Sequence, residues 1–221
     1  EFCEEREYTL EYQNNVDCED EFSLYHAEKF AESLNLSSRG NKIQAKDYQL
    51  NALIHAMQKR RCLLLSPTAS GKSLIIYMIF RQLLDYQNLK GLIIVPTTSL
   101  VEQLFSDFAD YSSNSDFNVE DNVHRIYQGK DKNSEKKLII STWQSIYQMP
   151  KEWFEQFDYV MGDEAHGFKS QSLTTIMINA INTKYRIGLT GTLDGTKTHK
   201  LVLEGLFGPV KSVAKTKELI D

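Results

Sequence analysis

The chain has few cysteines and no long hydrophobic run, and each absence excludes a class of protein. Its three cysteines, Cys3, Cys18 and Cys62, are odd in number and far apart, which fits neither a disulfide framework nor a zinc site and indicates a reducing compartment. No apolar run approaches the roughly 18 residues of a membrane span. The acidic first residues also lack the basic and apolar pattern of a secretory signal. We therefore expect a cytoplasmic protein without a membrane partner.

The composition is that of an ordinary globular protein. The chain has 221 residues, of which 41% are hydrophobic and 25% charged, as is typical of folded domains. This length accommodates one large domain or two small ones. Folding can bury roughly 70% of the surface of such a chain, so a stable core requires no metal or disulfide.

The net charge of −5 is unevenly distributed along the chain. Residues 1–32 contain eleven acidic and two basic residues, whereas residues 33–221 contain 19 acidic and 23 basic residues. The main body is therefore mildly basic behind an acidic N-terminal segment. Such a body permits a nucleic-acid partner but does not require one.

Residues 1–40 are interpreted as an acidic accessory segment, the end of an upstream domain. Residues 8–12 are typical of a short strand, and the apolar residues of 22–36 recur near helical spacing. Residues 37–41 contain serine, glycine and asparagine, which predict a linker or turn. We expect a second unit over residues 41–221.

In that second unit, helical patterns alternate with short apolar runs. The runs, which predict buried strands, are 62–65, 92–95, 138–140, 159–161 and 185–189. The predicted helices are 48–59, 73–86, 99–111, 145–154 and 173–181. This alternation predicts an α/β fold, a doubly wound and mostly parallel sheet with helices on both faces.

The stretch 110–137 is the least regular part of this unit. Residues 123–127 could add a strand there. Its lysines form either a solvated loop or a patch that contacts phosphates; they are Lys130, Lys132, Lys136 and Lys137.

A glycine-lysine-serine sequence follows the predicted strand 62–65 and precedes an apolar helix. In a phosphate-binding loop, backbone N–H groups and the positive end of the helix face the phosphates. Lys72 would then reach the β- and γ-phosphates of ATP, and the Ser73 hydroxyl would bind Mg²⁺. Serine replaces the usual first glycine, and a plain helix cap is the alternative. The predicted cofactor-binding residues are Gln49, Ser66, Pro67, Thr68, Ala69, Ser70, Gly71, Lys72 and Ser73.

An acidic pair, Asp163 and Glu164, follows the predicted strand 159–161 and lies 91 residues beyond Lys72. With a phosphate-binding loop present, Asp163 would hold Mg²⁺ through water, and Glu164 would orient and deprotonate the attacking water. The alternative is a helix N-cap followed by a first-turn glutamate. No second histidine or cysteine lies at ligand spacing from His166, so zinc is disfavoured.

Together these sequences resemble motifs I and II of superfamily 2 helicases and translocases. Four further motifs of the first RecA-like domain follow in order, so the resemblance covers residues 46–210; they include Tyr48-Gln49, residues 95–103, residues 140–146 and residues 188–193. Among members of this family, the chain is similar to a recombination and repair helicase of T-even phages. A phage-encoded protein would lie in the host cytoplasm.

The resemblance implies a role for each remaining motif. Gln49 would read the adenine edge, for which its amide can donate and accept, and His166 would join Lys72, Asp163 and Glu164 at the catalytic centre. The predicted nucleic-acid contacts are Pro96, Thr97, Thr98, Ser99, Thr142 and Gln144. Threonine and serine at strand ends suit phosphate binding, although they also cap helices, and Trp143 is a core residue or a stacking platform. Thr190, Gly191 and Thr192 would couple the ATP state to strand movement.

For the whole protein, the resemblance implies an ATP- and Mg²⁺-dependent DNA helicase or branch-migration motor. Its partners would be branched or single-stranded DNA, RNA–DNA hybrids, and single-stranded-DNA-binding or recombination proteins. The family's second RecA-like domain supplies an arginine finger, and about 30 residues after residue 193 are too few to form it. We therefore expect the isolated chain to hydrolyse ATP poorly.

Three alternatives stay open from the sequence. The same motifs occur in the motor of a nuclease-associated translocase such as a restriction enzyme, and in a DEAH-type RNA helicase. A nucleotide-binding scaffold without hydrolysis is the third, which the intact Lys72, Asp163 and Glu164 disfavour.

Overall fold

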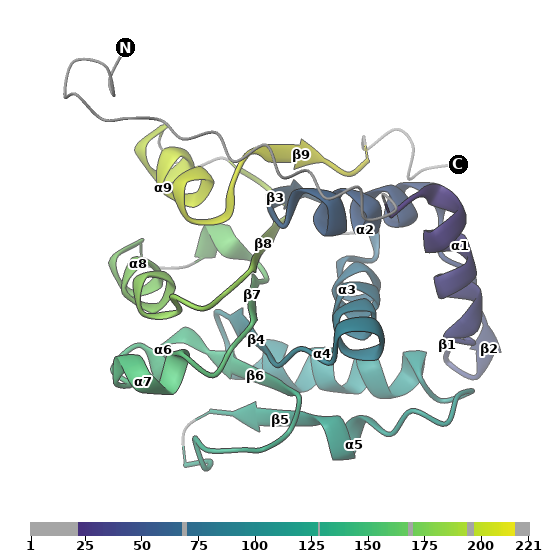
Figure 1. Cartoon of the computed structure of the whole chain (residues 1–221), viewed down its shortest axis with the longest axis horizontal. Coiled ribbons are helices and arrows are strands. Elements are labelled where there is room, and N and C mark those ends of the chain that lie inside the picture. The colour runs from purple at the N-terminus through teal and green to yellow at the C-terminus, as the bar shows by residue number, and fades with distance from the viewer. Residues whose placement is uncertain (1–21, 68–69, 128, 168–169, 194–196, 215–221) are drawn as a thin grey trace.

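A single sheet of seven strands, all paired in parallel, lies at the centre of the residues described by the computed structural model, which are 22–67, 70–127, 129–167, 170–193 and 197–214 (Figure 1). The predicted strand at residues 8–12 lies outside these ranges. In spatial order the strands are β5 (Val123–Ile126), β6 (Leu138–Thr142), β4 (Gly91–Val95), β7 (Tyr159–Gly162), β8 (Tyr185–Thr190), β3 (Arg61–Leu65) and β9 (Val210–Ser212).

The register of the sheet brings the ends of several strands to one edge. Val95 at the end of β4 pairs with Thr142 at the end of β6, and Leu65 at the end of β3 pairs with Thr190 at the end of β8. Parallel strands all point the same way, so the residues that follow them gather at this carboxyl edge. The predicted motifs that follow strands therefore lie at this edge, whereas Gln49 lies on α2, ahead of β3.

Helices cover both faces of the sheet, which confirms the doubly wound prediction (Figure 1). On one face lie α2 (Asp47–Lys59), α3 (Lys72–Gln87), α4 (Thr98–Tyr111) and the short α5 (Val119–Asn122); on the other lie α6 (Trp143–Ile146), α7 (Lys151–Phe154), α8 (Ser170–Asn179) and α9 (Lys197–Phe207). Each layer buries its own apolar cluster against the sheet. Among the described helices, none combines the length and the apolar composition needed to cross a membrane.

The predicted helix within residues 22–36 is observed as α1 (Leu24–Ser33). Its Phe30 and the following Leu34 are buried in the same apolar cluster as α2 and α3. The predicted turn at residues 37–41 includes a small hairpin of β1 (Ser37–Ser38) and β2 (Asn41–Lys42). The described part of the acidic segment therefore packs on the main core, while the division of the chain at residue 40 stays a prediction.

The single helix predicted over residues 145–154 is wrong. The structure has two short helices instead, α6 and α7, separated by Pro150. Proline lacks a backbone N–H and clashes with the preceding turn, so it is tolerated at a helix start but not in its interior. Pro150 is accordingly the N-cap of α7.

The sequence patterns also left the C-terminal part of the sheet undescribed. Strand β9 joins the open side of β3, pairing Leu63 with Val210 and Leu65 with Ser212. Helix α9 packs on β3 and β8, with Phe207 fully buried. The optional strand at 123–127 is confirmed as β5.

Candidate functional site

The loop after β3 is closed by its own hydroxyl groups. Ser70 donates to the carbonyl oxygen of Pro67 at 2.5 Å. Because a hydroxyl has one proton, Ser66 must be the donor and Ser70 the acceptor in the contact between their hydroxyls. The backbone N–H of Ser66 donates to the carbonyl of Thr190 on β8 at 2.9 Å. Because Ser66 and Ser70 are fully buried, serine replaces the usual first glycine without leaving a polar group unsatisfied. The predicted Thr68 and Ala69 lie outside the described residues.

Gly71 ends this loop in a conformation that favours glycine. Its φ of +71° is left-handed, and a Cβ there would lie 2.6 Å from Nε2 of Gln49. Helix α3 begins at the next residue, Lys72, so the positive end of its dipole faces the carboxyl edge of the sheet. An anion placed there would meet the first N–H groups of the helix.

Gln49 supports the loop from α2. Its side chain is only 5% exposed; Nε2 donates to the carbonyl of Ser70 at 2.9 Å, and Oε1 accepts from the backbone N–H of Lys46 at 2.9 Å. The structure therefore brings Gln49 to the predicted phosphate-binding loop. Its adenine role stays a prediction.

Lys72 and Glu164 form an ion pair between α3 and the loop after β7. Lys72 is only 8% exposed, and Glu164 has a left-handed φ of +50°, which is unusual for a residue with a Cβ. Such strain clusters at functional sites. In this arrangement the Glu164 carboxylate is the partner of the Lys72 ammonium group, for which the sequence predicts a phosphate partner.

Asp163 is a buried carboxyl group, 5% exposed. Burial and then the neighbouring Glu164 charge raise its pKa from 3.8 to about 6, although Lys72 acts in the opposite direction. In the part of the chain that the structure describes, Asp163 has no ion pair of its own. Its carboxylate accepts a hydrogen bond from the backbone N–H of Glu164 at 2.9 Å. A bound cation would neutralise this group.

The donor set at this edge fits Mg²⁺. Ser73 and Asp163 offer hard oxygen ligands, and Mg²⁺ in nucleotide sites takes one or two protein ligands and otherwise water and phosphate oxygens. Within the described ranges, no group of three histidine, cysteine or acidic side chains could hold a metal by itself. The Ser73 hydroxyl lies 2.8 Å from the hydroxyl of Tyr111 at the end of α4, a contact that the sequence did not predict.

His166 connects the acidic loop to the end of β8. Its Nδ1 lies 2.7 Å from the hydroxyl of Thr190 and 3.3 Å from Oε2 of Glu164. Thr190 donates to the carbonyl of Thr192 at 2.7 Å, so it can accept a proton from Nδ1. The structure thus joins the predicted coupling residues, Thr190 and Thr192, to the predicted catalytic His166; Gly191 lies between them in the chain.

The predicted nucleic-acid contacts lie at the ends of two adjacent strands, β4 and β6. Gln144 donates to the carbonyl of Pro96 at 3.2 Å, which joins the two motifs. The Thr97 hydroxyl accepts a hydrogen bond from the backbone N–H of Leu100 and caps α4. The helix-cap interpretation from the sequence is therefore confirmed for Thr97. Thr97, Thr98, Ser99 and Gln144 are exposed, whereas Thr142 is buried and contacts Ser145.

The lysine-rich stretch divides into two parts. Lys136 donates to the carbonyls of Glu120 and Val123 and so holds the chain around β5. Lys130 and Lys132 instead line a cavity of about 410 Å³ together with Tyr127 and Gln144. Both sequence interpretations of this stretch, solvated loop and phosphate patch, stay open for the second part.

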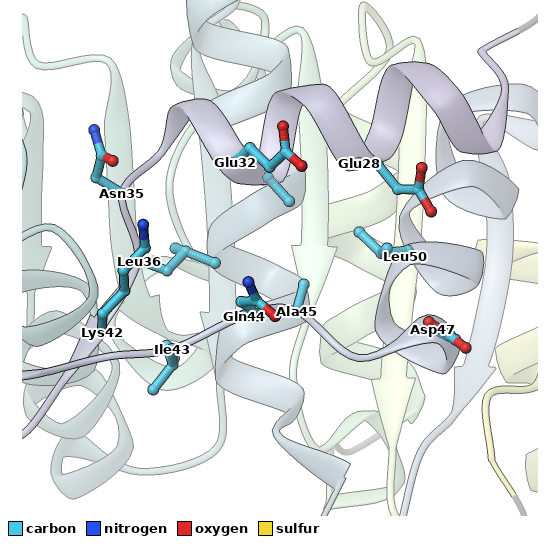
Figure 2. Close-up of a pocket in the computed structure, with 11 residues that line it drawn as sticks. Glu28, Glu32, Asn35, Leu36, Lys42, Ile43, Gln44, Ala45, Asp47 and Leu50 are labelled. Carbon is cyan, nitrogen blue, oxygen red and sulfur yellow. The ribbon is translucent and has the colours of Figure 1, made fainter.

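Figure 2 shows a separate cavity of about 250 Å³ between α1 and the chain that leads into α2. Glu28 and Glu32 descend from α1, and Asp47 and Leu50 belong to α2. None of the predicted ATP-site residues lines it. It therefore lies outside the site built at the carboxyl edge of the sheet.

Comparison with known proteins identifies the family. The model of the "type III restriction enzyme, res subunit" family matches residues 41–195. The ATP-dependent DNA helicase uvsW of enterobacteria phage T4 is 31% identical over the whole chain, which spans 44% of that relative. The DNA 3'-5' translocase XPB2 of Sulfurisphaera tokodaii is 26% identical over 87% of the chain, which spans 40% of it.

A solved structure agrees with these relatives. The crystal structure of the UvsW helicase from bacteriophage T4 matches with a TM-score of 0.82 and 30% identity, covering 96% of this chain and 75% of that one. The chain spans less than half the length of the relatives named above. It belongs to the family of the type III restriction enzyme res subunit and has the RecA-like fold of the superfamily 2 helicases.

Proposed function

We propose that this chain is the first motor domain of an ATP-dependent DNA helicase or translocase. The observation that carries the proposal is the assembly of Lys72, Asp163 and Glu164 at the carboxyl edge of the sheet. The T4 relative is described as an ATP-dependent DNA helicase, and the archaeal one as a DNA translocase. A scaffold without hydrolysis would not need both acidic residues beside Lys72, so the presence of Asp163 and Glu164 together favours hydrolysis.

The site residues divide the work of phosphoryl transfer. ATP phosphates that enter at the α3 N-terminus compete with Glu164 for Lys72. The Lys72 ammonium group then leaves the Glu164 carboxylate and binds a phosphate oxygen. Glu164 is thereby released to orient a water molecule. That water attacks the γ-phosphorus, its proton passes to Glu164, and the bond to the β–γ bridging oxygen breaks to leave ADP and phosphate.

Mg²⁺ would be held by Ser73 and Asp163, where it neutralises phosphate charge. Gln49 would face the adenine while it holds the loop through Ser70. His166 contacts both Glu164 and Thr190, so a movement of Glu164 on ATP binding would shift His166 and change its contact with Thr190.

The nucleic-acid strand would cross the ends of β4 and β6. The exposed hydroxyls of Thr97, Thr98 and Ser99 and the amide of Gln144 suit phosphate contacts that carry no base sequence. Within this proposal the substrate is branched DNA, such as junctions, stalled forks and R-loops. A second RecA-like domain would supply the arginine finger, which is worth roughly 10³–10⁵ in rate in related systems.

The test is ATP hydrolysis by the longest available form of the protein, with branched DNA, single-stranded DNA, RNA–DNA hybrid and RNA at a fixed salt concentration. Strong stimulation by branched or single-stranded DNA supports the proposal. Stimulation by RNA alone supports the RNA helicase, and no stimulation by any nucleic acid supports the scaffold. The 221-residue chain alone spans 44% of its T4 relative. Because an arginine finger from a second domain is worth roughly 10³–10⁵ in rate, the chain alone should turn over below about 1 s⁻¹.

The second candidate is the motor of a nuclease-associated translocase. The family description, a restriction enzyme res subunit, favours it. Cleavage of unbranched DNA by the longest form, dependent on ATP, would replace the helicase proposal with this one.

A further inference from the structure

The hydroxyl of Ser73 has a partner on a different helix. Ser73 is the second residue of α3 and Tyr111 is the last residue of α4, and their side-chain oxygens lie 2.8 Å apart. No motif in the sequence includes Tyr111. The contact therefore adds a residue to the surroundings of the predicted metal ligand.

Tyr111 is held firmly in this position. Its ring packs on that of Tyr77 on α3, with the ring centres 5.7 Å apart. The preceding residue, Asp110, accepts the backbone N–H of Arg39 with both carboxylate oxygens at 2.9 Å. The last turn of α4 is thus fixed between the β1–β2 hairpin and the start of α3, so the Tyr111 hydroxyl has little freedom to leave Ser73.

The chemistry of a serine hydroxyl gives this contact a direction. The group has one proton and two lone pairs, and an oxygen that ligates a cation gives a lone pair to the metal. Its proton must then point away from the cation and toward an acceptor. The Tyr111 hydroxyl lies 2.8 Å from that of Ser73, and a phenol oxygen can accept this hydrogen bond.

We propose that Tyr111 is a positioning residue for Ser73. The Tyr111 oxygen accepts a hydrogen bond from the Ser73 hydroxyl, which leaves a lone pair of the Ser73 oxygen free to bind Mg²⁺. The inference rests on the proposed nucleotide site. It adds to that site a residue that acts through Ser73 rather than on the nucleotide.

The test compares Tyr111→Phe with the wild-type chain in binding of ADP labelled on its ribose, with Mg²⁺ and with EDTA. This variant keeps the ring that packs on Tyr77 and removes only the hydroxyl. Because one hydrogen bond is lost, the gain in affinity from Mg²⁺ should fall roughly twofold to tenfold. Affinity in EDTA should be unchanged. Tyr86→Phe is the matched control, since Tyr86 lies on α3 but is 68% exposed.

A double-mutant cycle separates positioning from a general effect on the fold. In the Ser73→Ala background, Tyr111→Phe should change the Mg²⁺ dependence no further, because the hydroxyl on which it acts is absent. An equal loss in both backgrounds would overturn the inference, as would an unchanged or stronger Mg²⁺ dependence in Tyr111→Phe alone. If wild-type ADP binding gains nothing from Mg²⁺, the proposed metal site itself is wrong and this inference falls with it.

Discussion

Lys72 and Glu164 are ion-paired across the carboxyl edge of the sheet although 92 positions separate them in the chain. The pair holds both side chains at the edge where the sequence predicts the ATP site. Lys72 is largely buried, and the Glu164 carboxylate lies beside its ammonium group. A buried charge loses its hydration, and an opposite charge in contact with it offsets part of that cost.

Glu164→Gln should abolish most ATP hydrolysis while ATP still binds. The amide keeps the size of the side chain and can still accept from Lys72, but it cannot take the proton of the attacking water. Loss of a general base lowers kcat by about 10²–10⁴-fold. Steady-state hydrolysis and equilibrium binding by the longest form of the protein measure the two effects.

Lys72→Ala should instead weaken nucleotide binding, because the phosphates lose their cation. Lys151→Ala is the control for both variants, since its pair with Glu155 is exposed and 4.0 Å long. Wild-type hydrolysis in Glu164→Gln would remove the assignment of the base.

Asp163→Asn should stabilise the folded chain at neutral pH. The folded pKa is raised from 3.8 to about 6, so the native state binds this proton more tightly than the unfolded state does. The resulting penalty grows as pH rises from about 4 to about 6 and persists above that, reaching about 3 kcal/mol. Asparagine carries no charge, so the folded Asp163→Asn variant does not have this penalty.

Urea unfolding of wild type and Asp163→Asn at pH 5 and pH 8, without nucleotide, measures this difference. The stabilisation should be larger at pH 8, with Asp116→Asn, an exposed site, as the control. An equal difference at both values would contradict the buried, unpaired carboxylate.

Gly71→Ala should destabilise the phosphate-binding loop. A residue with a Cβ at φ +71° costs about 1–2 kcal/mol, and the new Cβ would displace the Gln49 amide from Ser70. The midpoint temperature of thermal unfolding and the affinity for nucleotide should both fall in Gly71→Ala. Gly205→Ala on α9 is the control, because nothing lies within 4 Å of its Cβ and alanine favours a helix by about 0.5–1 kcal/mol. Equal stability of the two variants would be inconsistent with the strain.

Thr190→Val should separate ATP binding from its response to DNA. Valine keeps the shape of the buried side chain but removes the hydroxyl that contacts His166 and Thr192. Nucleotide affinity should change little, while stimulation of hydrolysis by DNA should fall several-fold. Thr175→Val is the control, since that exposed hydroxyl bonds only within α8 to Gln171. Full stimulation in Thr190→Val would exclude this threonine from the coupling.

Local patterns predicted most of the sheet and the start of the key helix. Short apolar runs are strands when both faces are buried, as in β4 and β8, and a glycine before Lys72 marks a helix start. The same reasoning failed over residues 145–154, where apolar spacing was given more weight than Pro150. It also missed β9, a short and partly exposed edge strand. This strand is recognised by its pairing with β3 in the structure and not by a run of apolar residues.

The sequence by itself determined which groups the site contains: the lysine and serine at a helix start, the acidic pair after a strand, and the hydroxyls after other strands. These signals are local, because a strand end or helix start depends on neighbouring residues. Only the tertiary structure decided that Lys72 pairs with Glu164, that His166 meets Thr190, and that Tyr111 reaches Ser73. Those contacts depend on the order of parallel strands and on the packing of α4 against α3, which no local pattern specifies.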